Sequence, residues 1–345
     1  MFFASDNSGI VHPKIMQRMV DANTGYAMPY GNDEIMDEVR TQIRELFEAP
    51  EAAVYLVATG TAANSLALAC YTQPWQTIFC AQYSHIEEDE CNAPEFYAGG
   101  AKLTLIPSDN KMTPDALAAA IDHRAGGSVH MAQSGAVSIT QVTEFGSVHS
   151  LEELRALTAV AKEANLPVHL DGARFANALV AIDCTPAEMT WKAGVDVVSF
   201  GGTKNGCAGV EAVIFFDPSK AQEFEYRRKR GAHLFSKHRY LSAQMAAYLT
   251  DGLWTDMARK ANANCARLTA GLRANGAKFL HEPQANMIFA SFPRAVHQKL
   301  HADGARYYVL DGDVATGPAE EHLACRLVCD WAMTDDLIDQ FLSHF

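Results

Sequence analysis

The stretch Val168-His169-Leu170-Asp171-Gly172-Ala173-Arg174 and the later stretch Ser199-Phe200-Gly201-Gly202-Thr203-Lys204-Asn205-Gly206 decide how this chain can fold. Each stretch contains the end of a short, mostly apolar run, 167–170 or 196–200, and continues in small or polar residues. That pattern is typical of a buried strand that delivers a functional side chain at its carboxyl end. The side chains delivered are Asp171 and Lys204, about thirty residues apart. Both stretches therefore predict strands of an α/β sheet.

Similar apolar runs recur along the first two thirds of the chain, separated by stretches of helical periodicity. The expected strands are 53–58, 77–81, 102–106, 136–142, 167–170, 196–200 and 210–216. The expected helices are 33–47, 61–71, 114–121, 150–164 and 186–193, several opened by Ser, Thr or Asp at the N-cap position. This alternation predicts a mostly parallel seven-stranded sheet with helices on both faces.

The pattern changes after a long helical stretch at about 240–274. Short strands are expected at 277–281, 287–292 and 325–329, with a helix near 293–302 and another closing the chain. We therefore expect a large domain over 1–250 and a small α+β domain over 251–345. Because no repeat or Pro/Gly/Ser linker separates them, the two should pack tightly, with the active site between them at the carboxyl ends of the large domain's strands.

Composition limits the classes of function. The 345 residues are 48% apolar, enough for a large core, and 41 Asp and Glu against 28 Lys and Arg give a net charge of -13. Such a field repels phosphate backbones, so nucleic acid is not an expected partner. The eight cysteines form no Cys-x-x-Cys pair, the start of the chain has no basic leader, and no run of about 18 apolar residues occurs. We expect a cytoplasmic protein with reduced cysteines and no membrane contact.

The first motif with possible chemistry is Thr59-Gly60-Thr61-Ala62-Ala63-Asn64, which follows an apolar strand and opens a helix. The first N–H groups of a helix have no internal partners, so such a turn can hold a phosphate. Gly60 lets the backbone approach the anion, and the Thr61 hydroxyl can add a hydrogen bond. A Gly-Thr turn before a helix is also an ordinary cap, so this motif alone decides nothing.

The second motif places Asp171 at the end of a strand with Arg174 three residues on. A carboxylate there can keep a pyridinium nitrogen protonated, as pyridoxal phosphate (PLP) requires to act as an electron sink. The competing interpretation is an Asp that caps the next helix with Arg174 as its salt-bridge partner. Taken alone, this segment does not separate the two.

The third motif is Lys204, which leaves a buried strand among glycines that leave room for a flat ring. An amine that bonds to an aldehyde cofactor must first lose its proton, which a partly desolvated site favours. A surface lysine in a Gly-rich loop is the alternative. The order of a phosphate turn, an Asp after a strand and a Lys after a later strand favours a PLP site.

At this point the chain resembles the threonine aldolases of the aspartate-aminotransferase-like PLP superfamily, and the resemblance runs essentially end to end. Thr203-Lys204-Asn205 and Ser236-Lys237-His238-Arg239 bring it closer to the low-specificity bacterial branch. The other matching segments, beyond the three motifs above, are Ser5-Asp6-Asn7, Tyr30-Gly31-Asn32-Asp33, His85 and Arg326-Leu327-Val328. The resemblance implies PLP-dependent transferase fold type I. It also implies cleavage of L-threonine, L-allo-threonine and related β-hydroxy-α-amino acids to glycine and an aldehyde.

The same resemblance implies roles around the cofactor. Lys204 would bind PLP covalently, Asp171 would pair with the ring nitrogen, and His85 would stack on the ring. His85 is also the candidate base for the β-hydroxyl proton, directly or through a water. The remaining cofactor contacts implied are Gly60, Thr61, Thr203, Arg174 and Arg239.

Other implied roles concern the substrate and the assembly. Ser5, Arg174 and Arg326 would grip the substrate carboxylate, which suits a planar guanidinium. Tyr30 and Arg239 would reach into the site of a neighbouring subunit, in a tetramer built from dimers. Glu90 matches a family glutamate, and the acidic run around it could instead be a favourable helix start.

Two other functions fit parts of the pattern. A PLP-dependent β-eliminating lyase would use the same lysine and aspartate but remove a Cα proton first. A non-catalytic nucleotide-binding α/β protein could use the Gly-rich turns, although no Gly-x-Gly-x-x-Gly follows the first strand. No metal is expected, because His297 and His301 lack a His-Glu-x-x-His context.

Overall fold

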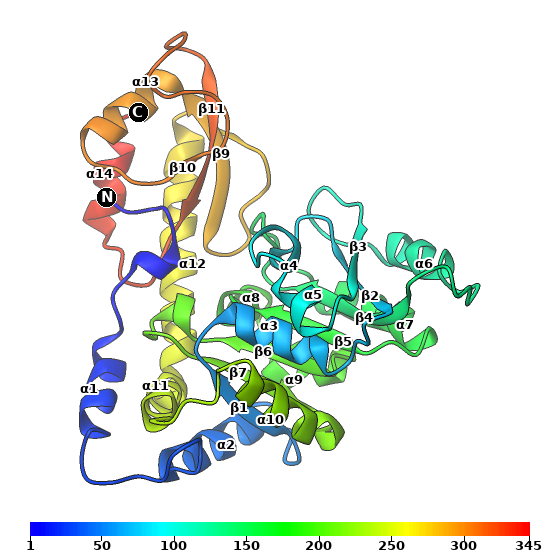
Figure 1. Cartoon of the computed structure of the whole chain (residues 1–345). Coiled ribbons are helices and arrows are strands. Elements are labelled where there is room, and N and C mark those ends of the chain that lie inside the picture. Colours follow the sequence, from blue (N-terminus) through cyan, green and yellow to red (C-terminus); the bar gives the residue numbers. More distant parts are fainter.

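The computed structural model describes all residues 1–345 and divides into a large sheet domain and a smaller domain beside it (Figure 1). The expected seven-stranded, mostly parallel sheet is present, with strand order β1-β7-β6-β5-β4-β2-β3. Its strands are β1 (Ala53–Val57), β2 (Gln76–Ala81), β3 (Lys102–Ile106), β4 (Gln133–Thr140), β5 (Val168–Gly172), β6 (Val197–Gly201) and β7 (Glu211–Phe215). Only β7 runs against its neighbours, pairing antiparallel with both β1 and β6.

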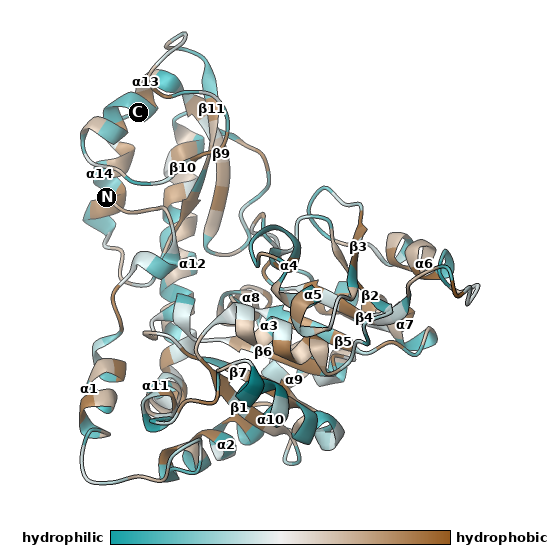
Figure 2. Ribbon diagram, in the orientation of Figure 1, coloured by the Kyte–Doolittle hydropathy of each residue, from teal (hydrophilic) through white to brown (hydrophobic).

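The sheet forms where it does because its central strands are apolar on both faces. Every residue of β5, β6 and β7 is buried, as expected for strands covered by helices on each side. The strands are accordingly brown in the hydropathy view of Figure 2. Phe47, Phe175 and Phe200 pack together at centroid separations of 5.3 to 5.6 Å under one face. This core holds the carboxyl ends of β5 and β6 in place.

Side-chain caps fix where several helices start. Asp33 accepts a hydrogen bond from Met36 N at 3.0 Å, and Ser150 forms a reciprocal capping box with Glu153. The helices of the large domain are α1 (Pro13–Asp21), α2 (Glu34–Leu46), α3 (Gly60–Ala69), α4 (His85–Glu88), α5 (Ala93–Tyr97), α6 (Pro114–Asp122), α7 (Leu151–Glu163), α8 (Phe175–Ile182), α9 (Pro186–Met189) and α10 (Ala221–Arg230). The expected helices therefore lie within a few residues of their predicted bounds.

The long helical stretch expected at 240–274 is two helices. They are α11 (Arg239–Leu249) and α12 (Leu253–Ala274), separated at Thr250–Gly252. The break occurs because Asp251 and Gly252 have left-handed backbone with φ of 52° and 71°. α12 then runs from the large domain into the small one in Figure 1. At 22 residues it is the longest helix, and no helix is both long and apolar enough to cross a membrane.

The small domain is a four-stranded antiparallel sheet in the order β10-β11-β9-β8, covered by helices. Its other elements are β8 (Lys278–Phe279), β9 (Met287–Pro293), α13 (Arg294–Ala302), β10 (Tyr308–Val309), β11 (His322–Val328) and α14 (Asp335–Leu342). The start of the chain belongs to this packing, because Phe3 is buried in the small domain's core and its backbone bonds to Arg306 and Val328 at 2.8 Å. The N-terminal residues thus pack against the C-terminal part of the chain.

Candidate functional site

A cavity of about 360 Å³ lies where β5, β6 and the loop after β1 end. Its lining is mostly polar and contains carboxylate side chains as well as a lysine. The lining residues are Asn7, Ala58, Thr59, Gly60, Thr61, Asn64, His85, Asp89, Asp171, Ala173, Thr203, Lys204 and Glu211. The three sequence motifs, of which the first is more than a hundred residues before the other two, therefore meet at one edge of the sheet, as expected for parallel strands.

Lys204 sits in a short 3-10 turn, η3 (Thr203–Asn205), directly after β6. The buried Asn205 anchors this turn by donating to Tyr248 Oη and to the Trp254 carbonyl, both at 2.8 Å. Gly206 ends it with φ of 104°, where a Cβ would lie 2.7 Å from Met257 Sδ. The turn is therefore rigid on the protein side while Lys204 faces the cavity.

Four side chains form a continuous hydrogen-bonded chain across the site. Asn64 Nδ2 donates to Asp171 Oδ2 and to Glu90 Oε1, each at 2.8 Å. Glu90 Oε1 also lies 2.8 Å from His85 Nδ1. Asp171 Oδ1 accepts the Ala173 N–H at 3.0 Å. The predicted residues His85, Glu90 and Asp171 are thus brought together, and Asn64, to which the sequence reasoning gave no role, connects them.

The electrostatics of this chain act mainly on His85. Its hydrogen bond to Glu90 raises the pKa of His85, burial opposes this, and the Asp171 carboxylate raises it further. With Nδ1 held by Glu90, the Nε2 atom is the one left for a ligand. Glu90 is 3% exposed, and its Oε2 atom has no partner in the chain.

The turn before α3 forms the opposite wall of the cavity. Thr59 caps the helix, its hydroxyl accepting the Ala62 N–H at 3.2 Å, so Gly60 and Thr61 start the first turn. A Cβ placed on Gly60 would meet nothing within 4 Å, so this backbone borders open space. The helix N-terminus therefore presents free N–H groups to the cavity, which is the arrangement that binds phosphate.

Arg174 forms a buried ion pair that the sequence did not predict. Its Nε and Nη2 donate to Asp6 at 2.7 and 3.0 Å, and Asn286 Nδ2 donates to the same carboxylate at 3.1 Å. Burial would raise the pKa of Asp6, but the charges of Arg174 and Lys204, with the hydrogen bonds from Arg174 and Asn286, together hold that pKa below its ordinary value. Nη1 of Arg174 has no partner in the chain.

Arg326 and Ser5 lie beside this pair, outside the cavity lining. Arg326 Nη2 donates to the Ala4 carbonyl at 3.0 Å, while its buried Nε has no partner. Burial and then the nearby Arg174 charge lower the pKa of Arg326. Ser5 Oγ accepts the Asn7 N–H at 3.1 Å as a cap. Two neighbouring guanidinium groups with unused N–H donors form a site suited to a small anion.

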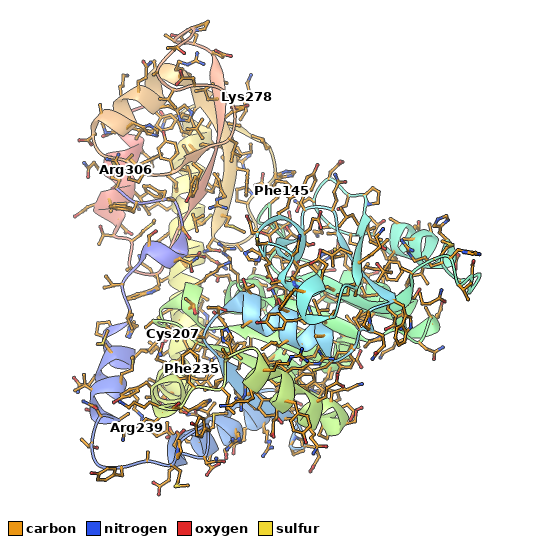
Figure 3. The ribbon with its side chains drawn as sticks, in the orientation of Figure 1. Phe145, Cys207, Phe235, Arg239, Lys278 and Arg306 are labelled. Atoms are coloured by element: carbon orange, nitrogen blue, oxygen red, sulfur yellow. The ribbon has the colours of Figure 1, made fainter.

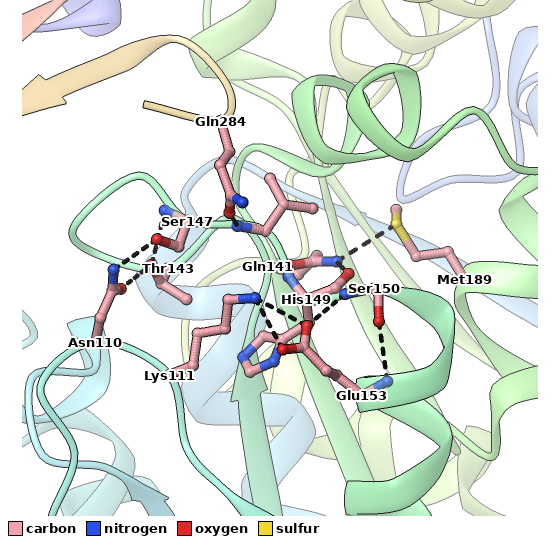
Figure 4. Close-up of polar contacts among 11 residues, drawn as sticks. Asn110, Lys111, Gln141, Thr143, Ser147, His149, Ser150, Glu153, Met189 and Gln284 are labelled. Atoms are coloured by element: carbon pink, nitrogen blue, oxygen red, sulfur yellow. Dashed lines mark hydrogen bonds and ion pairs between the residues drawn. The ribbon is translucent and has the colours of Figure 1, made fainter. Parts of the chain in front are cut away.

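Glu144, in the loop after β4, was missed by the sequence reasoning. β4 lies between β2 and β5, so its loop emerges between those that carry His85 and Asp171. Hydrogen bonds on both sides fix the loop: Thr143 Oγ1 donates to Asn110 Oδ1 at 2.6 Å (Figure 4). Val148 N donates to Gln284 Oε1 at 2.7 Å.

The Glu144 carboxyl itself makes no hydrogen bond within the chain. Burial raises its pKa, opposed by the charges of His85 and Lys204. A single polar residue in a loop carries no sequence signal, so only the strand order identifies this group.

Glu211 was also missed, although a signal was present. It is the first residue of β7, in an otherwise apolar run, and it is 6% exposed. A charged residue in a strand buried on both faces is rare unless it has a partner. Its Oε2 accepts the Gly202 N–H at 2.9 Å, next to the Lys204 turn.

Tyr30 and Arg239 lie outside the cavity of their own chain. Arg239 Nη1 donates to the Thr24 and Gly25 carbonyls at 3.1 and 3.3 Å, and Figure 3 shows it at the lower edge of the molecule. Tyr30 is 41% exposed, with Lys229 Nζ 5.2 Å from the centre of its ring.

The arrangement fits a flat phosphorylated ring held covalently. It offers an amine in Lys204, a carboxylate in Asp171 and an anion-binding helix start at Gly60, around a cavity of about 360 Å³. Unpartnered Oδ1 of Asn64 and Oε2 of Glu90 are buried beside it. The donor set lacks the cluster of three or more His, Cys, Asp or Glu that could hold a metal ion.

Comparison with known proteins gives matches over most of the chain. Residues 3–295 match the family model described as beta-eliminating lyase. A low specificity L-threonine aldolase from Pseudomonas sp. (strain NCIMB 10558) is 40% identical over 332 residues, which are 95% of this chain and 92% of the relative. The low specificity L-threonine aldolase of Escherichia coli K12 is 30% identical over 47% of each chain.

Solved structures agree with these matches. The threonine aldolase of Leishmania major superimposes with a TM-score of 0.92 at 27% identity, covering 99% of this chain and 97% of that one. Serine palmitoyltransferase of Sphingomonas wittichii, at 16% identity, has a TM-score of 0.71 over 100% of this chain and 86% of its own, which shows a shared fold.

The contact between His85 and Glu90 leads to a prediction. In Glu90→Gln the pKa of His85 should fall, because the hydrogen bond to the charged Glu90 that raises it is lost while burial still lowers it. An NMR titration of the His85 ring in ¹³C-histidine-labelled protein measures this. Glu153→Gln, a change at the α7 capping box, is the control and should leave the His85 titration unmoved. An unchanged His85 pKa in Glu90→Gln would contradict the assignment.

Proposed function

The chain belongs to the beta-eliminating lyase family, and within it to the low-specificity L-threonine aldolases; from that membership we propose that the cavity at Lys204 binds PLP and cleaves β-hydroxy-α-amino acids such as L-threonine and L-allo-threonine to glycine and an aldehyde. The observation that carries the proposal is that Lys204, Asp171 and the start of α3 line one cavity, beside a pair of guanidinium groups.

Different residues around the cavity hold different parts of the cofactor. Lys204 Nζ binds it covalently, Gly60 and Thr61 hold the phosphate, and Asp171 keeps a proton on the ring nitrogen. The bound cofactor supplies an electron sink for the pair of electrons released when a bond at Cα breaks. Asn64 fixes the Asp171 carboxylate through its 2.8 Å hydrogen bond, so that the carboxylate stays aimed into the cavity.

Arg326 and Arg174 bind the substrate carboxylate, assisted by Ser5. Support comes from the unpartnered Nε of Arg326 and the unused Nη1 of Arg174, two groups close enough for the Arg174 charge to lower the pKa of Arg326. Fixing the carboxylate would also favour breakage of one bond at Cα over the others, because it sets how the substrate is oriented in the site. Asp6 holds Arg174 in position for this contact.

Cleavage of Cα–Cβ requires that the β-hydroxyl loses its proton and that Cα gains one. His85 would take the hydroxyl proton at Nε2, directly or through a water, and its ring would stack on the bound cofactor. Glu144 lies within electrostatic range of His85 and is free of hydrogen bonds. It provides a second group able to exchange the proton with His85.

The β-elimination alternative is distinguished by its products. An aldolase yields glycine and an aldehyde, whereas a β-eliminating lyase yields pyruvate and ammonia from serine-like substrates. A relative that matches nearly the whole chain is a threonine aldolase, which favours the aldolase reaction, and membership of an enzyme family argues against the non-catalytic alternative.

The eight cysteines are all free, which supports our assignment of the protein to the cytoplasm.

We also propose that the active unit is at least a symmetric dimer, within a tetramer built from dimers, whose sites receive Tyr30 and Arg239 from the neighbouring subunit. Supporting this, both residues lie outside their own cavity, and the segment before Tyr30 leaves Tyr26 and Met28 exposed. Two exposed apolar side chains on one short segment are typical of an interface.

The cofactor assignment predicts a covalent adduct. Borohydride reduction of the purified holoenzyme, followed by peptide mass spectrometry, should place the pyridoxyl phosphate group on Lys204. Lys204→Ala should give no such adduct, while Lys192→Ala, a change in a surface pair with Glu48, should behave as the parent. An adduct on a different lysine would overturn the assignment of the site.

The carboxylate assignment predicts the effect of Arg326→Ala. Losing a hydrogen bond to a charged group costs about 1.5–3 kcal/mol, so kcat/KM for L-threonine should fall at least about tenfold. The kcat/KM of Arg326→Lys should lie between that of the parent and that of Arg326→Ala, because lysine keeps the charge without the planar guanidinium. Cofactor absorbance should be normal in both variants. Wild-type kinetics in Arg326→Ala would show that the segment Arg326-Leu327-Val328 is only part of a core strand of the small domain.

Shared sites predict complementation between inactive variants. Arg239→Ala should weaken phosphate binding, and Lys204→Ala should be inactive. When the two are mixed under conditions that allow subunit exchange, hybrid dimers contain one intact site and activity should return. Mixing Arg239→Ala with Arg326→Ala is a second pairing, in which the activity of the mixture should rise above that of either impaired variant alone. Mixtures as inactive as their components, with exchange verified by mass spectrometry, would refute the shared site.

A further inference from the structure

Glu211 is a buried acid that none of the roles above uses. It pairs with Gly201 in the antiparallel register of β7 and β6, so its side chain lies beside the last residues of the strand that leads to Lys204. It also lines the same cavity as Lys204, Thr203 and Asp171. Cys207, labelled in Figure 3, lies in the loop between the Lys204 turn and β7.

The contacts of Glu211 all converge on the residues just before Lys204. Its Oε2 accepts the Gly202 N–H at 2.9 Å, and the neighbouring Thr203 hydroxyl acts against the effect of burial on the pKa of Glu211. Thr203 Oγ1 in turn accepts the Val210 N–H at 3.1 Å. The carboxylate thus ties the start of β7 to both residues that precede Lys204.

Four titratable groups from four parts of the fold surround Glu211. Lys204 and Asp171 face it from their turn and from β5, and Cys207 and Tyr248 lie beside it from the following loop and α11. Burial raises the pKa of Cys207 and of Tyr248, so these two remain neutral. Burial likewise raises the pKa of Glu211 to about 7, while Lys204 acts in the opposite direction. Lys204 is therefore the cation in the cavity that opposes the effect of burial on Glu211.

We propose that Glu211 is the positioning residue and charge partner of Lys204: it holds the turn that presents Nζ and balances the positive charge at Nζ. The proposal rests on the proposed function, in which that nitrogen is bound to PLP and is released when substrate binds. A carboxylate that only supported the turn could be replaced by an amide, because a Gln side chain can still accept the Gly202 N–H. A charge partner could not.

The test is a pH titration of the cofactor absorbance of the holoenzyme, in the parent, Glu211→Gln and Glu211→Asp. In Glu211→Gln the midpoint should fall by at least about one pH unit, because an opposite charge close to a cation favours its protonated form by that amount or more. Glu211→Asp keeps the charge and should return the midpoint towards that of the parent.

The matched control is Asp196→Asn. Asp196 also accepts a backbone N–H, that of Val168 at 2.7 Å, but precedes β6 at the opposite end of the strand from Lys204. Its removal should leave the midpoint unchanged. A midpoint in Glu211→Gln equal to that of the parent would overturn the proposal and leave Glu211 as a support for the turn. If borohydride instead places the cofactor on another lysine, the proposed function itself fails.

A second measurement decides the matter if Glu211→Gln binds cofactor poorly. In urea unfolding of the full chain without cofactor, the change in midpoint caused by Glu211→Gln should be less favourable with Lys204 present than in a Lys204→Met background, because only the former leaves a cation without its partner. Equal changes in both backgrounds would overturn the charge pairing.

Discussion

The buried ion pair between Asp6 and Arg174 is the interaction on which the arrangement of Arg174, Ser5 and Arg326 beside the cavity depends. It joins the N-terminal segment to the loop after β5, and Asn286 attaches the same carboxylate to the small domain. Removing one partner of such a pair leaves an uncompensated buried charge and costs about 3–5 kcal/mol. The pair also determines where Ser5 and the Ala4 carbonyl lie, and the latter holds Arg326. Three distant parts of the chain are therefore aligned by one carboxylate.

The second organising feature is the alternation of acids and bases along the edge of the sheet. Glu90 and Asp171 are linked through Asn64, while Glu144 and Glu211 lie towards His85 and Lys204. These environments differ, and so do the ionisation properties they confer: the hydrogen bond to Glu90 raises the pKa of His85, while burial raises those of Glu144 and Glu211. Groups set apart in this way can carry protons in different steps of one reaction at one pH.

The arrangement of the domains follows from the break between α11 and α12. A single helix from Arg239 to Ala274 would run straight past the sheet, whereas the left-handed residues Asp251 and Gly252 redirect the chain. α12 can then pack on α8 with one part and under the small sheet with the other. Trp254 and Met257, near its start, also contact Asn205 and the turn at Gly206, so the same helix supports the Lys204 turn.

Local sequence determined the seven strands, most of the helices, and the positions of Lys204 and Asp171 at strand ends, because the periodicity of buried side chains and the capping residues act over a few neighbours. The edge of the sheet at which the motifs meet followed from the parallel order of the strands. Only the tertiary structure decided the antiparallel direction of β7, which brings Glu211 to Lys204.

The tertiary structure also decided the pairing of Arg174 with Asp6, 168 residues away in the chain, and the place of Glu144 between His85 and Lys204. It likewise placed Tyr30 and Arg239 outside their own cavity. The physical reason is the same in each case: the partner of a charged side chain is chosen by proximity in space, and burial makes that choice strong, but neither quantity is present in a local stretch of sequence.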